Sequence, residues 1–357
     1  MDKKVLIAMS GGVDSSVTAS LLKGQGYDCI GAMMKLYTGN GSIAGHSSGC
    51  CSLEDAEDAR AVAFRLGIPF YVFNFTGCFA REVIKRFVEA YQNGVTPNPC
   101  IDCNRYLKFD RFLRRAREIQ IDHIATGHYA QIEHDAASGR YLLKKAADEA
   151  KDQSYVLYRM TQEQLAMTLF PLGGLHKSQV REIALEHGFV NAKKQESQDI
   201  CFVPDGDYAA FIEEHTGTKF EKGRFVDSRG NDLGEHKGII HYTVGQRRGL
   251  GLSSSMPLYV HSIKPESRTI VVGEERELYS RTLTAKDINF IPFDRLDAPL
   301  RIHAKIRYRQ PEQPATISQL DPGTLRVDFD HPQRAIAKGQ AVVLYDGDVV
   351  IGGGIIM

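Results

Sequence analysis

A glycine-rich turn between an apolar run and a helical pattern constrains the fold of this chain more than any other feature. The run Val5–Met9 is typical of a buried strand, the turn Ser10–Ser16 is Ser-Gly-Gly-Val-Asp-Ser-Ser, and the helical pattern ends at Gly24. Backbone N–H groups in such a turn approach phosphate closely, and the following helix N-terminus favours negative charge. We therefore expect a phosphate-binding loop in an ATP-consuming enzyme. The alternative is a tight strand-to-helix turn without a ligand.

The residues of the loop indicate which class of nucleotide-binding loop it belongs to. Asp14 would repel phosphate unless a cation lies between them, which predicts Mg²⁺. The Gly-Lys-Ser/Thr ending of the Walker loop and the spaced glycines of the dinucleotide fingerprint are both missing. The segment resembles the Ser-Gly-Gly-x-Asp-Ser loop of ATP pyrophosphatases, which implies binding of the β and γ phosphates, adenylation of a carbonyl oxygen and release of pyrophosphate.

Strand and helix patterns alternate through the first half of the chain. Further strands are expected at 29–36, 69–75 and 124–126, and helices at 53–66, 80–91 and 104–117. This alternation predicts an α/β fold, a doubly wound and mainly parallel sheet with helices on both faces. The Gly- and Ser-rich segment 38–49 is expected to be a mobile loop near the site.

The pattern changes from about Tyr208 onward. Short β-like runs separated by Gly, Asp and Pro occur at 258–260, 269–272, 341–345 and 349–351. They predict one or two small antiparallel barrels. The expected domains are a catalytic domain (1–207), a small central β-rich domain (208–277) and a C-terminal β-barrel domain (278–357).

The overall charge gives no sign of a polyanionic partner. Lys and Arg together number 44, as do Asp and Glu, so any nucleic-acid binding has to come from local patches. The predicted helix 104–117 carries such a patch, although a charged helix face is more often merely solvated. The apolar run near the N-terminus is too short for a membrane span, so a cytoplasmic enzyme without a membrane partner is expected.

Seven cysteines favour reactive or metal-binding thiols over a disulfide scaffold in a cytoplasmic chain. Cys103 follows a proline-restricted loop and opens the basic helix, a setting that lowers the pKa of a thiol. Cys201 is the second candidate, and spacing alone cannot pair it with Cys103. Structural zinc at Cys100 and Cys103 would lack a second pair of ligands.

The other cysteines carry weaker signals. Burial in the core is the expectation for Cys29 and Cys78. The adjacent Cys50 and Cys51 stay unassigned.

These features together resemble one family, the tRNA-specific 2-thiouridylases, which replace O2 of the wobble uridine by sulfur. Matching segments follow the family's order over nearly the whole chain. They are Ser10–Ser16, Thr96–Asn104, Ala125–Tyr129, Lys151–Tyr155, Ser197–Phe202, Tyr242–Gly251, Arg307–Arg309 and Gly352–Gly354. Several unrelated motifs in one order make coincidence a poor explanation.

The resemblance implies a tRNA-uridine 2-sulfurtransferase that acts on position 34 in the anticodon loop. ATP would adenylate the uracil C2 oxygen, and Cys201 would carry sulfur as a persulfide received from a donor protein. The sulfur would attack C2 as the persulfide or after release as hydrosulfide. Cys103 would reduce the persulfide and leave a transient Cys103–Cys201 disulfide, with AMP and pyrophosphate as products. A monomeric enzyme is expected.

The resemblance also assigns binding residues. Those for ATP would be Ala8, Met9, Ser10, Gly11, Gly12, Val13, Asp14, Ser15, Met34 and Gly127. Those for tRNA would be Asn98 and Pro99 at the target base, together with Lys151, Asp152, Gln153, Arg307 and Tyr308. Arg and Tyr combine phosphate binding with stacking on an unstacked base.

One position departs from the family. Many members carry Asp where this chain has Cys100, which puts the general acid or base in doubt. Cys100, Cys103 and Cys201 could instead hold a [4Fe–4S] cluster with one iron open to sulfide. Two further alternatives are an amide-forming ligase of the same superfamily and a tRNA-binding protein without catalytic activity.

Overall fold

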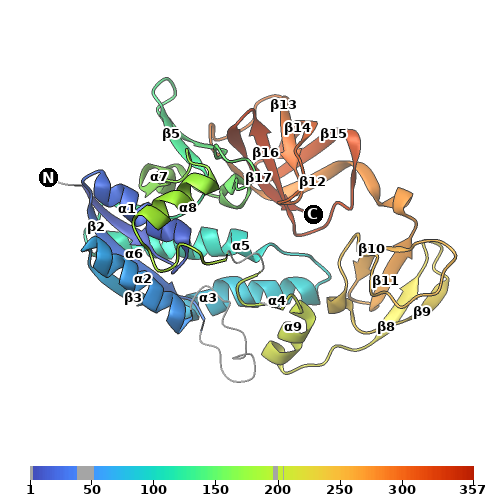
Figure 1. Cartoon of the computed structure of the whole chain (residues 1–357). Coiled ribbons are helices and arrows are strands. Elements are labelled where there is room, and N and C mark those ends of the chain that lie inside the picture. The colour runs from blue at the N-terminus through green and yellow to red at the C-terminus, as the bar shows by residue number, and fades with distance from the viewer. Residues whose placement is uncertain (1–2, 38–51, 196–199, 204) are drawn as a thin grey trace. The chain divides into compact units, whose positions relative to one another are not determined.

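The computed structural model describes residues 3–37, 52–195, 200–203 and 205–357 and forms two compact units (Figure 1). Unit 1 comprises Met1–Val83, Cys100–Pro204 and Gly347–Ile351. Unit 2 comprises Ile84–Pro99, Asp205–Asp346 and Gly352–Met357. The predicted loop 38–49 and the pair Cys50 and Cys51 lie outside the described residues. The three predicted domain boundaries stay a prediction.

Unit 1 is built on a parallel sheet with the strand order β3-β2-β1-β4-β7. The strands are β1 (Lys4–Ala8), β2 (Asp28–Lys35), β3 (Phe70–Asn74), β4 (His123–Ala125) and β7 (Thr168–Leu169). Each neighbouring pair is parallel, which confirms the expected doubly wound sheet. The chain moves outward from β1 to β2 and β3, then returns to place β4 on the other side of β1. The β1/β4 boundary is therefore the switch point of the sheet.

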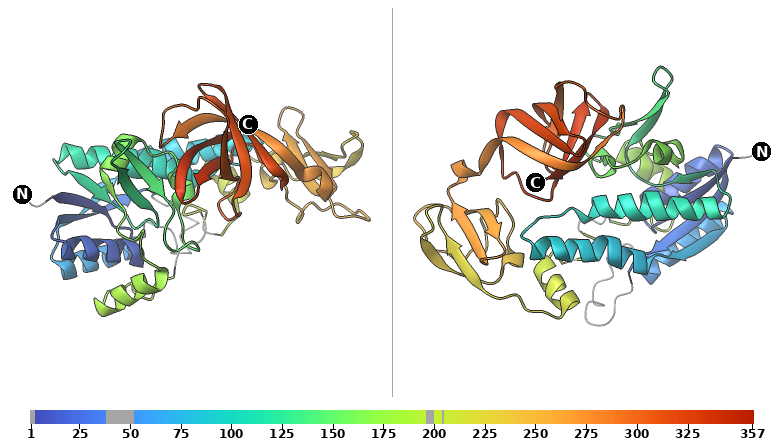
Figure 2. Two further views of the ribbon diagram at one scale, coloured as in Figure 1. Left: turned by 90° about the horizontal axis from the view of Figure 1, so that it is seen from above. Right: turned by 180° about the vertical axis from the view of Figure 1, so that it is seen from behind.

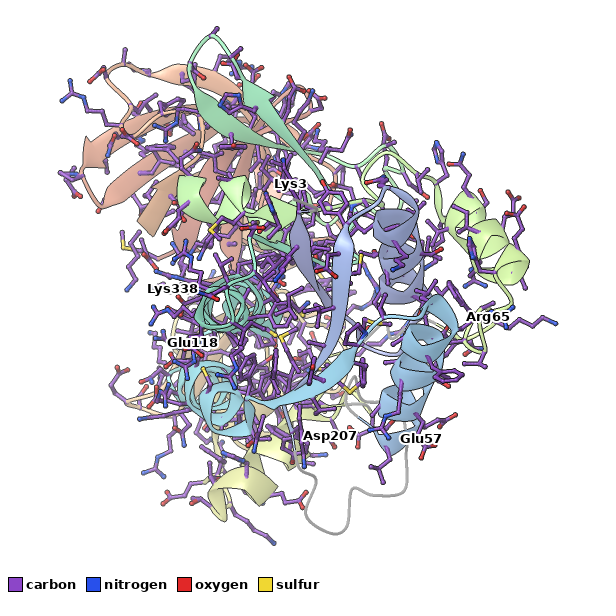
Figure 3. All side chains as sticks on the ribbon, turned by 90° about the vertical axis from the view of Figure 1, so that its left-hand side faces the viewer. Lys3, Glu57, Arg65, Glu118, Asp207 and Lys338 are labelled. Carbon is purple, nitrogen blue, oxygen red and sulfur yellow. The ribbon has the colours of Figure 1, made fainter. Side chains whose placement is uncertain are left out.

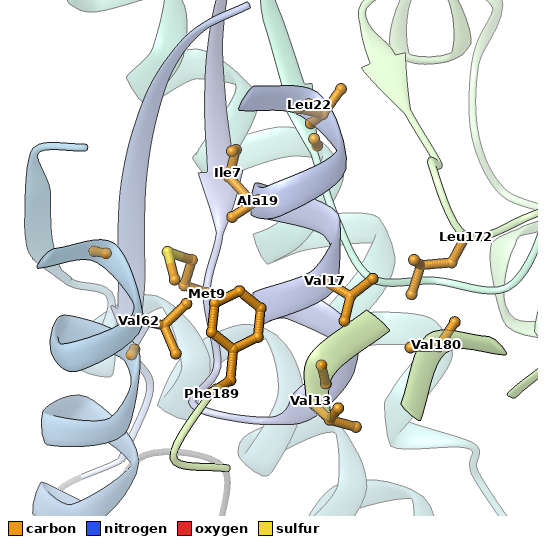
Figure 4. Packing of buried hydrophobic residues seen from close by; sticks show 14 of the residues in the cluster. Ile7, Met9, Val13, Val17, Ala19, Leu22, Val62, Leu172, Val180 and Phe189 are labelled. Atoms are coloured by element: carbon orange, nitrogen blue, oxygen red, sulfur yellow. The ribbon is translucent and has the colours of Figure 1, made fainter. Parts of the chain in front are cut away.

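Helices cover both faces of this sheet. On one face α1 (Val13–Gly24) packs against α2 (Leu53–Leu66) and α8 (Lys177–Glu186). Figure 3 places Glu57 and Arg65 of α2 on this side and Glu118 of α6 (Phe112–Glu118) on the other. The core beside α1, α2 and α8 is mostly aliphatic, with Val17, Val62 and Val180 around the ring of Phe189 (Figure 4).

The second face carries an unusual helix. The predicted helix 104–117 begins as a π-helical stretch, η2 (Cys103–Arg111), before continuing as α6. The predicted helix 80–91 likewise begins as η1 (Ala80–Ile84) and continues as α4 (Lys85–Gln92). Such π-helical turns are rare and concentrate at functional sites. Both helices were expected from the spacing of their apolar residues. That spacing does not distinguish π-helical from α-helical hydrogen bonds.

The remaining elements lie before β4 or between β4 and α8. They are α3 (Thr76–Phe79), α5 (Pro99–Asp102), the hairpin β5 (Gln131–Asp135) and β6 (Arg140–Lys144), η3 (Ser154–Leu157) and α7 (Gln162–Ala166). The hairpin was not predicted. Its turn is closed by Asp135, whose carboxylate accepts hydrogen bonds from the N–H groups of Ala137 and Ser138.

Unit 2 holds two β structures, seen from further directions in Figure 2. The smaller sheet has the order β10-β11-β8-β9, formed by β8 (Gly223–Val226), β9 (Asp232–His236), β10 (Tyr259–Lys264) and β11 (Thr269–Gly273). Sequence patterns predicted antiparallel pairing, but β8 and β11 pair in parallel. The long connection between them permits this, since parallel strands need an extended crossover.

The larger β structure closes on itself. Its order is β12-β15-β14-β13-β16-β17, with β12 also paired to β17. Its strands are β12 (Tyr279–Phe290), β13 (Leu300–Lys305), β14 (Gln313–Asp321), β15 (Thr324–Arg334), β16 (Ala341–Asp346) and β17 (Val349–Ile356). This confirms the predicted C-terminal barrel. Unit 2 also contains α9 (Tyr208–Thr216), η4 (Ile239–His241) and η5 (Glu275–Leu278). Among the residues described, no helix has both the length and the apolar character of a membrane span.

Candidate active site

Two loops meet at the switch point of the sheet. Strand β1 leads into the glycine-rich turn, and β4 leads into the segment Thr126–Tyr129. A Cβ atom on Gly127 would lie 2.9 Å from the carbonyl carbon of Asp14 and 2.9 Å from the nitrogen of Ser15. The second loop therefore contacts the first turn of α1 because residue 127 is glycine. Ligands of open α/β sheets bind in this position, outside the carboxyl ends of the strands.

Hydroxyl groups fix the shape of the glycine-rich turn. Ser15 Oγ donates to the carbonyl of Gly12 at 3.0 Å and accepts from the N–H of Ser10 at 3.2 Å. Ser16 Oγ donates to the same carbonyl at 3.1 Å. Gly12 is the N-cap of α1 and supplies no side-chain cap. The first N–H groups of the helix are therefore not capped from that position, which suits an anion.

Gly11 allows the turn to approach helix α2. Its φ is +78°, and a Cβ there would lie 2.3 Å from the carbonyl oxygen of Asp55. Gly12 has a φ of −88°, and among the described residues its Cβ would meet only Ser10 Oγ, at 3.5 Å. The two neighbouring glycines thus have different constraints. Only Gly11 requires both a left-handed backbone and the absence of a side chain.

This difference gives a prediction for folding. Gly11→Ala is expected to lower the free energy of unfolding by roughly 2–4 kcal/mol, from left-handed strain and overpacking. Gly12→Ala is the matched control and should change that free energy by less than about 1 kcal/mol. Urea unfolding of both variants measures the difference. Equal losses would show that the contact with Asp55 does not constrain the loop.

Asp14 is held by two residues distant in sequence. Lys177 Nζ lies 2.7 and 2.8 Å from its two carboxylate oxygens, and the hydroxyl of Tyr129 donates to Oδ1 at 2.8 Å. Lys177 and Tyr129 are 8% and 3% exposed. The Lys177 ammonium thus balances the Asp14 charge in this structure, and the Mg²⁺ expected between Asp14 and phosphate stays a prediction. No local sequence signal indicated Lys177, because the first residue of α8 is 163 positions away.

A second distant segment braces the turn from within unit 1. Asn191 Nδ2 donates to the carbonyl of Gly11 at 2.8 Å and to Ser16 Oγ at 2.9 Å, while its Oδ1 has no partner among the described residues. Lys194 pairs with Asp55 at 2.8 Å and with Asp58 at 2.6 Å. Asn191 and Lys194 were also missed from the sequence. Both bond to groups that only the fold brings near them.

His128 anchors the second loop in a neutral state. Its Nδ1 lies 2.7 Å from Thr126 Oγ1 and its Nε2 lies 3.3 Å from Lys108 Nζ. Burial, reinforced by the Lys108 charge, holds the pKa of His128 well below its ordinary value. A neutral ring that accepts from Lys108 at Nε2 must donate from Nδ1 to Thr126. Lys108 of η2 is thereby tied to the loop that follows β4.

The His128 shift has a measurable effect on stability. The unfolded chain takes up this proton near pH 6.5 and the folded chain only at lower pH, so stability should fall as the pH drops below about 6.5. His128→Gln should show a shallower loss between pH 6.5 and 5 than the unsubstituted protein. Urea unfolding at several pH values measures both slopes. Identical slopes would mean that His128 does not titrate differently in the two states.

The two candidate thiols lie in connected parts of unit 1. Cys103 is 9% exposed and is the first residue of η2. Cys201 is half-buried, and the ring of its neighbour Phe202 packs edge-on against Phe79 at 5.6 Å. Phe79 belongs to α3, which packs against η2. The Cys201 segment is therefore fixed to an element that contacts the Cys103 helix.

The cluster alternative receives no support from the geometry. Cys100 is exposed, whereas Cys103 is buried. Within the described part of the chain, no three Cys, His, Asp or Glu side chains converge as metal ligands. The three thiols do not form a ready ligand set for an iron–sulfur cluster in this conformation.

The predicted tRNA residues fall in both units. In unit 1, Asp152 accepts from the N–H groups of Ala146 and Ser154, and Gln153 accepts from the N–H of Tyr129. These two side chains therefore stabilise the backbone around residues 146–154 and Tyr129, and Lys151 beside them is half-buried. In unit 2, Arg307 donates to the carbonyl of Ala335 at 3.4 Å, and Tyr308 is 37% exposed. Met34 lies in β2 of unit 1, and Asn98 lies just before Pro99, the first residue of α5.

The basic helix is less positive than its sequence indicated. Arg114 pairs with Asp110 at 2.8 Å, and Arg115 pairs with Glu118 at 2.7 Å. Arg117 pairs with Glu163. These carboxylates neutralise its C-terminal half, which weakens the case for a phosphate-binding surface there. The opposite side of this helix is apolar and faces the core, since Phe109 and Phe112 are buried.

The fold and the site together define a class. A parallel sheet with this loop at its switch point is an α/β nucleotide-binding enzyme of the ATP pyrophosphatase type. Family models match residues 3–205 ("tRNA methyl transferase HUP domain"), 209–274 ("tRNA methyl transferase PRC-barrel domain") and 280–356 ("Aminomethyltransferase beta-barrel domain").

Curated relatives identify the family. The tRNA-specific 2-thiouridylase MnmA of Clostridioides difficile (strain 630) is 54% identical, covering 100% of this chain and 98% of that protein. The protein of the same name from Acetivibrio thermocellus is 53% identical, covering 99% of both chains. The chain belongs to the tRNA-specific 2-thiouridylases. The family models use the words methyl transferase, but identity along both whole chains is the more specific finding.

Solved structures give weaker matches. NMN synthetase from Francisella tularensis has a TM-score of 0.35 and 17% identity, covering 62% of this chain and 79% of that one. Likeness at this level adds nothing to the assignment.

Proposed function

We propose that this chain thiolates the wobble uridine of tRNA at C2, using ATP and releasing AMP and pyrophosphate. One observation carries the proposal. Within a single compact unit of a 2-thiouridylase, the phosphate loop lies at the switch point, and the Cys201 segment is attached to an element that packs on the Cys103 helix. Activation by ATP and delivery of sulfur thus have their groups in one unit.

The nucleotide would bind at the glycine-rich turn. Its phosphates would face the first N–H groups of α1 and the hydroxyl of Ser10, while Met34 and Gly127 would contact the nucleoside. The other proposed contacts are Ala8, Met9, Gly11, Gly12, Val13, Asp14 and Ser15. Adenylation of the uracil C2 oxygen converts it into a leaving group, because AMP departs more readily than oxide.

Sulfur would then move between two thiols. The terminal sulfur of a Cys201 persulfide attacks C2, AMP leaves, and the uridine is held to Cys201 through a disulfide. The Cys103 thiolate attacks Cys201 Sγ, so that this bond breaks, sulfur stays on C2 and a Cys103–Cys201 disulfide forms. An external thiol reductant returns both cysteines to thiols. The persulfide is supplied by a donor protein.

Mg²⁺ would be held largely by the nucleotide. The chain offers Asp14 as a ligand, and among the described residues no group of three His, Cys, Asp or Glu side chains could hold the ion without the nucleotide. Mg²⁺ commonly binds through one carboxylate together with phosphate oxygens and water.

A monomer in the cytoplasm is the proposed working form.

Target tRNA would be held by residues of both units. Asn98 and Pro99 would lie against the uracil, with Lys151, Asp152, Gln153, Arg307 and Tyr308 contacting other parts of the anticodon arm. The uridine has to leave its stack to be reached, as for other enzymes that modify a base.

Product analysis tests the proposal. The purified chain, ATP, Mg²⁺, a persulfide donor and tRNA with U34 should yield 2-thiouridine, AMP and pyrophosphate in equal amounts. Neither α,β-methylene ATP nor tRNA with C34 should give thiolated product. Release of ADP and phosphate, or thiolation without nucleotide, would contradict the reaction.

A further inference from the structure

The loop Thr96–Pro99 has few means of holding its own shape. Pro97 and Pro99 have no N–H group, so Thr96 and Asn98 supply the only backbone donors in the loop. Regular backbone hydrogen bonding cannot fix such a segment. Its conformation has to be set by partners from elsewhere in the fold.

A segment of unit 2 immediately before β16 provides those partners. The carbonyl of Lys338 accepts from the N–H of Thr96 at 3.0 Å. Gln340 Nε2 donates to the carbonyls of Thr96 at 3.0 Å and Pro97 at 3.1 Å. Gln340 and Thr96 are each 7% exposed, so water competes poorly for these bonds. They fix the peptide groups that lead directly into Asn98.

Between these two residues the backbone approaches the loop closely. Gly339 has a φ of +86°, and a Cβ there would lie 2.1 Å from Val95 Cγ1 and 3.1 Å from the Thr96 carbonyl oxygen. Any side chain at 339 would push the loop away. We call residues 338–340 the clamp segment.

We infer that Gly339 and Gln340 are positioning residues for the sulfur-transfer reaction, because they set the direction of the loop that meets the target uracil. The inference rests on the proposed function, in which Asn98 and Pro99 contact that base. An apolar side chain at 340 would bury the same surface, but only a doubly donating amide orients two successive carbonyls. The clamp segment, near the C-terminus, would thereby affect thiolation of the uracil by orienting the Thr96–Pro99 loop.

A matched pair of glycine substitutions tests the clamp segment. Gly339→Ala meets Val95, whereas Gly347→Ala, also at positive φ (+58°), meets no described atom within 4 Å. Both substitutions place alanine in a left-handed backbone conformation, which lowers stability, but only Gly339→Ala displaces the loop. Displacement by about 1 Å should lower kcat for thiolation by on the order of 10²-fold in Gly339→Ala. Its KM for ATP should stay unchanged, and Gly347→Ala should keep the normal rate.

A compensating change separates positioning from general damage. Val95→Ala removes the Cγ1 atom that a residue-339 side chain would strike, so Val95→Ala/Gly339→Ala should regain most of the lost kcat, while Val95→Ala alone stays near normal. Gln340→Met keeps the length of the side chain but loses both donors, and it should lower kcat without rescue by Val95→Ala.

Hydrogen exchange supplies a readout independent of activity. The Thr96 N–H should exchange slowly in the unsubstituted protein, faster in Gly339→Ala and slowly again in the double variant. If exchange changes but kcat does not, or if Gly339→Ala behaves as Gly347→Ala in both measurements, the inference is overturned. Absence of 2-thiouridine in every protein, with exchange changing as expected, would instead overturn the proposed function and leave the clamp segment as a structural device only.

Discussion

Cys201→Ser is expected to lower the rate of 2-thiouridine formation by roughly 10³-fold or more, as for removal of other covalent nucleophiles. A hydroxyl group is nearly isosteric with the thiol but cannot carry a persulfide. Packing should change little, because the neighbouring Phe202 supplies the contact with Phe79. Thiolation is followed by nucleoside analysis of the tRNA, and ATP affinity by direct binding. Affinity for ATP should be unchanged.

Two other cysteines serve as controls for that substitution. Cys29 is 2% exposed, its thiol faces the carbonyl of Tyr27, and burial raises its pKa to about 11. Cys29→Ser should therefore retain activity within about threefold, since a structural thiol takes no part in transfer. Cys100→Ser should also retain it if the persulfide route operates. A Cys201→Ser enzyme with the normal rate would refute the persulfide assignment, and loss of activity together with iron in Cys100→Ser would favour the cluster.

Asp14→Ala is expected to lower both stability and activity strongly. It leaves the Lys177 ammonium, only 8% exposed, without its carboxylate, and breaking a buried pair in this way costs about 3–5 kcal/mol. It also removes the carboxylate proposed to hold Mg²⁺ beside the phosphates, and electrostatic groups of this kind contribute about 10²–10³-fold to rate. Chemical unfolding and the thiolation assay measure the two effects.

A double variant separates those effects. Asp14→Asn/Lys177→Met removes both charges while keeping volume and an acceptor for the Tyr129 hydroxyl. It should recover most of the stability, because no buried charge is left unpaired, but not the activity. Recovery of thiolation as well would mean that Asp14 acts only through folding.

The sequence predicted features that depend on local chemistry. Apolar runs that alternate with amphipathic patterns were enough to predict the strand β1, the helix α1 and the parallel sheet. Apolar residues recur with different periods in helices and strands, and strands buried on both faces are continuously apolar. The turn Ser10–Ser16 was recognised because glycine and hydroxyl residues between a strand and a helix are typical of a phosphate-binding loop. Cys103 and Cys201 were candidates from the sequence itself, and the resemblance supplied their separate roles.

Groups that act across long separations were not predictable in the same way. Lys177, Asn191 and Gln340 lie in ordinary-looking segments, and nothing in their neighbours reveals which carboxylate or carbonyl they will meet. The π-helical start of η2 was missed for a related reason. It depends on hydrogen-bond register, which packing sets and hydrophobic periodicity does not record.

The sequence by itself determined the class of fold, the phosphate loop and the residue types available for sulfur chemistry, because these follow from local period, backbone freedom and side-chain reactivity. Only the tertiary structure decided that Lys177 pairs with Asp14, that Asn191 holds the turn, and that the clamp segment holds the Thr96–Pro99 loop. The physical reason is that a buried charge or a buried carbonyl requires a partner. Which distant residue satisfies that requirement depends on how the chain packs.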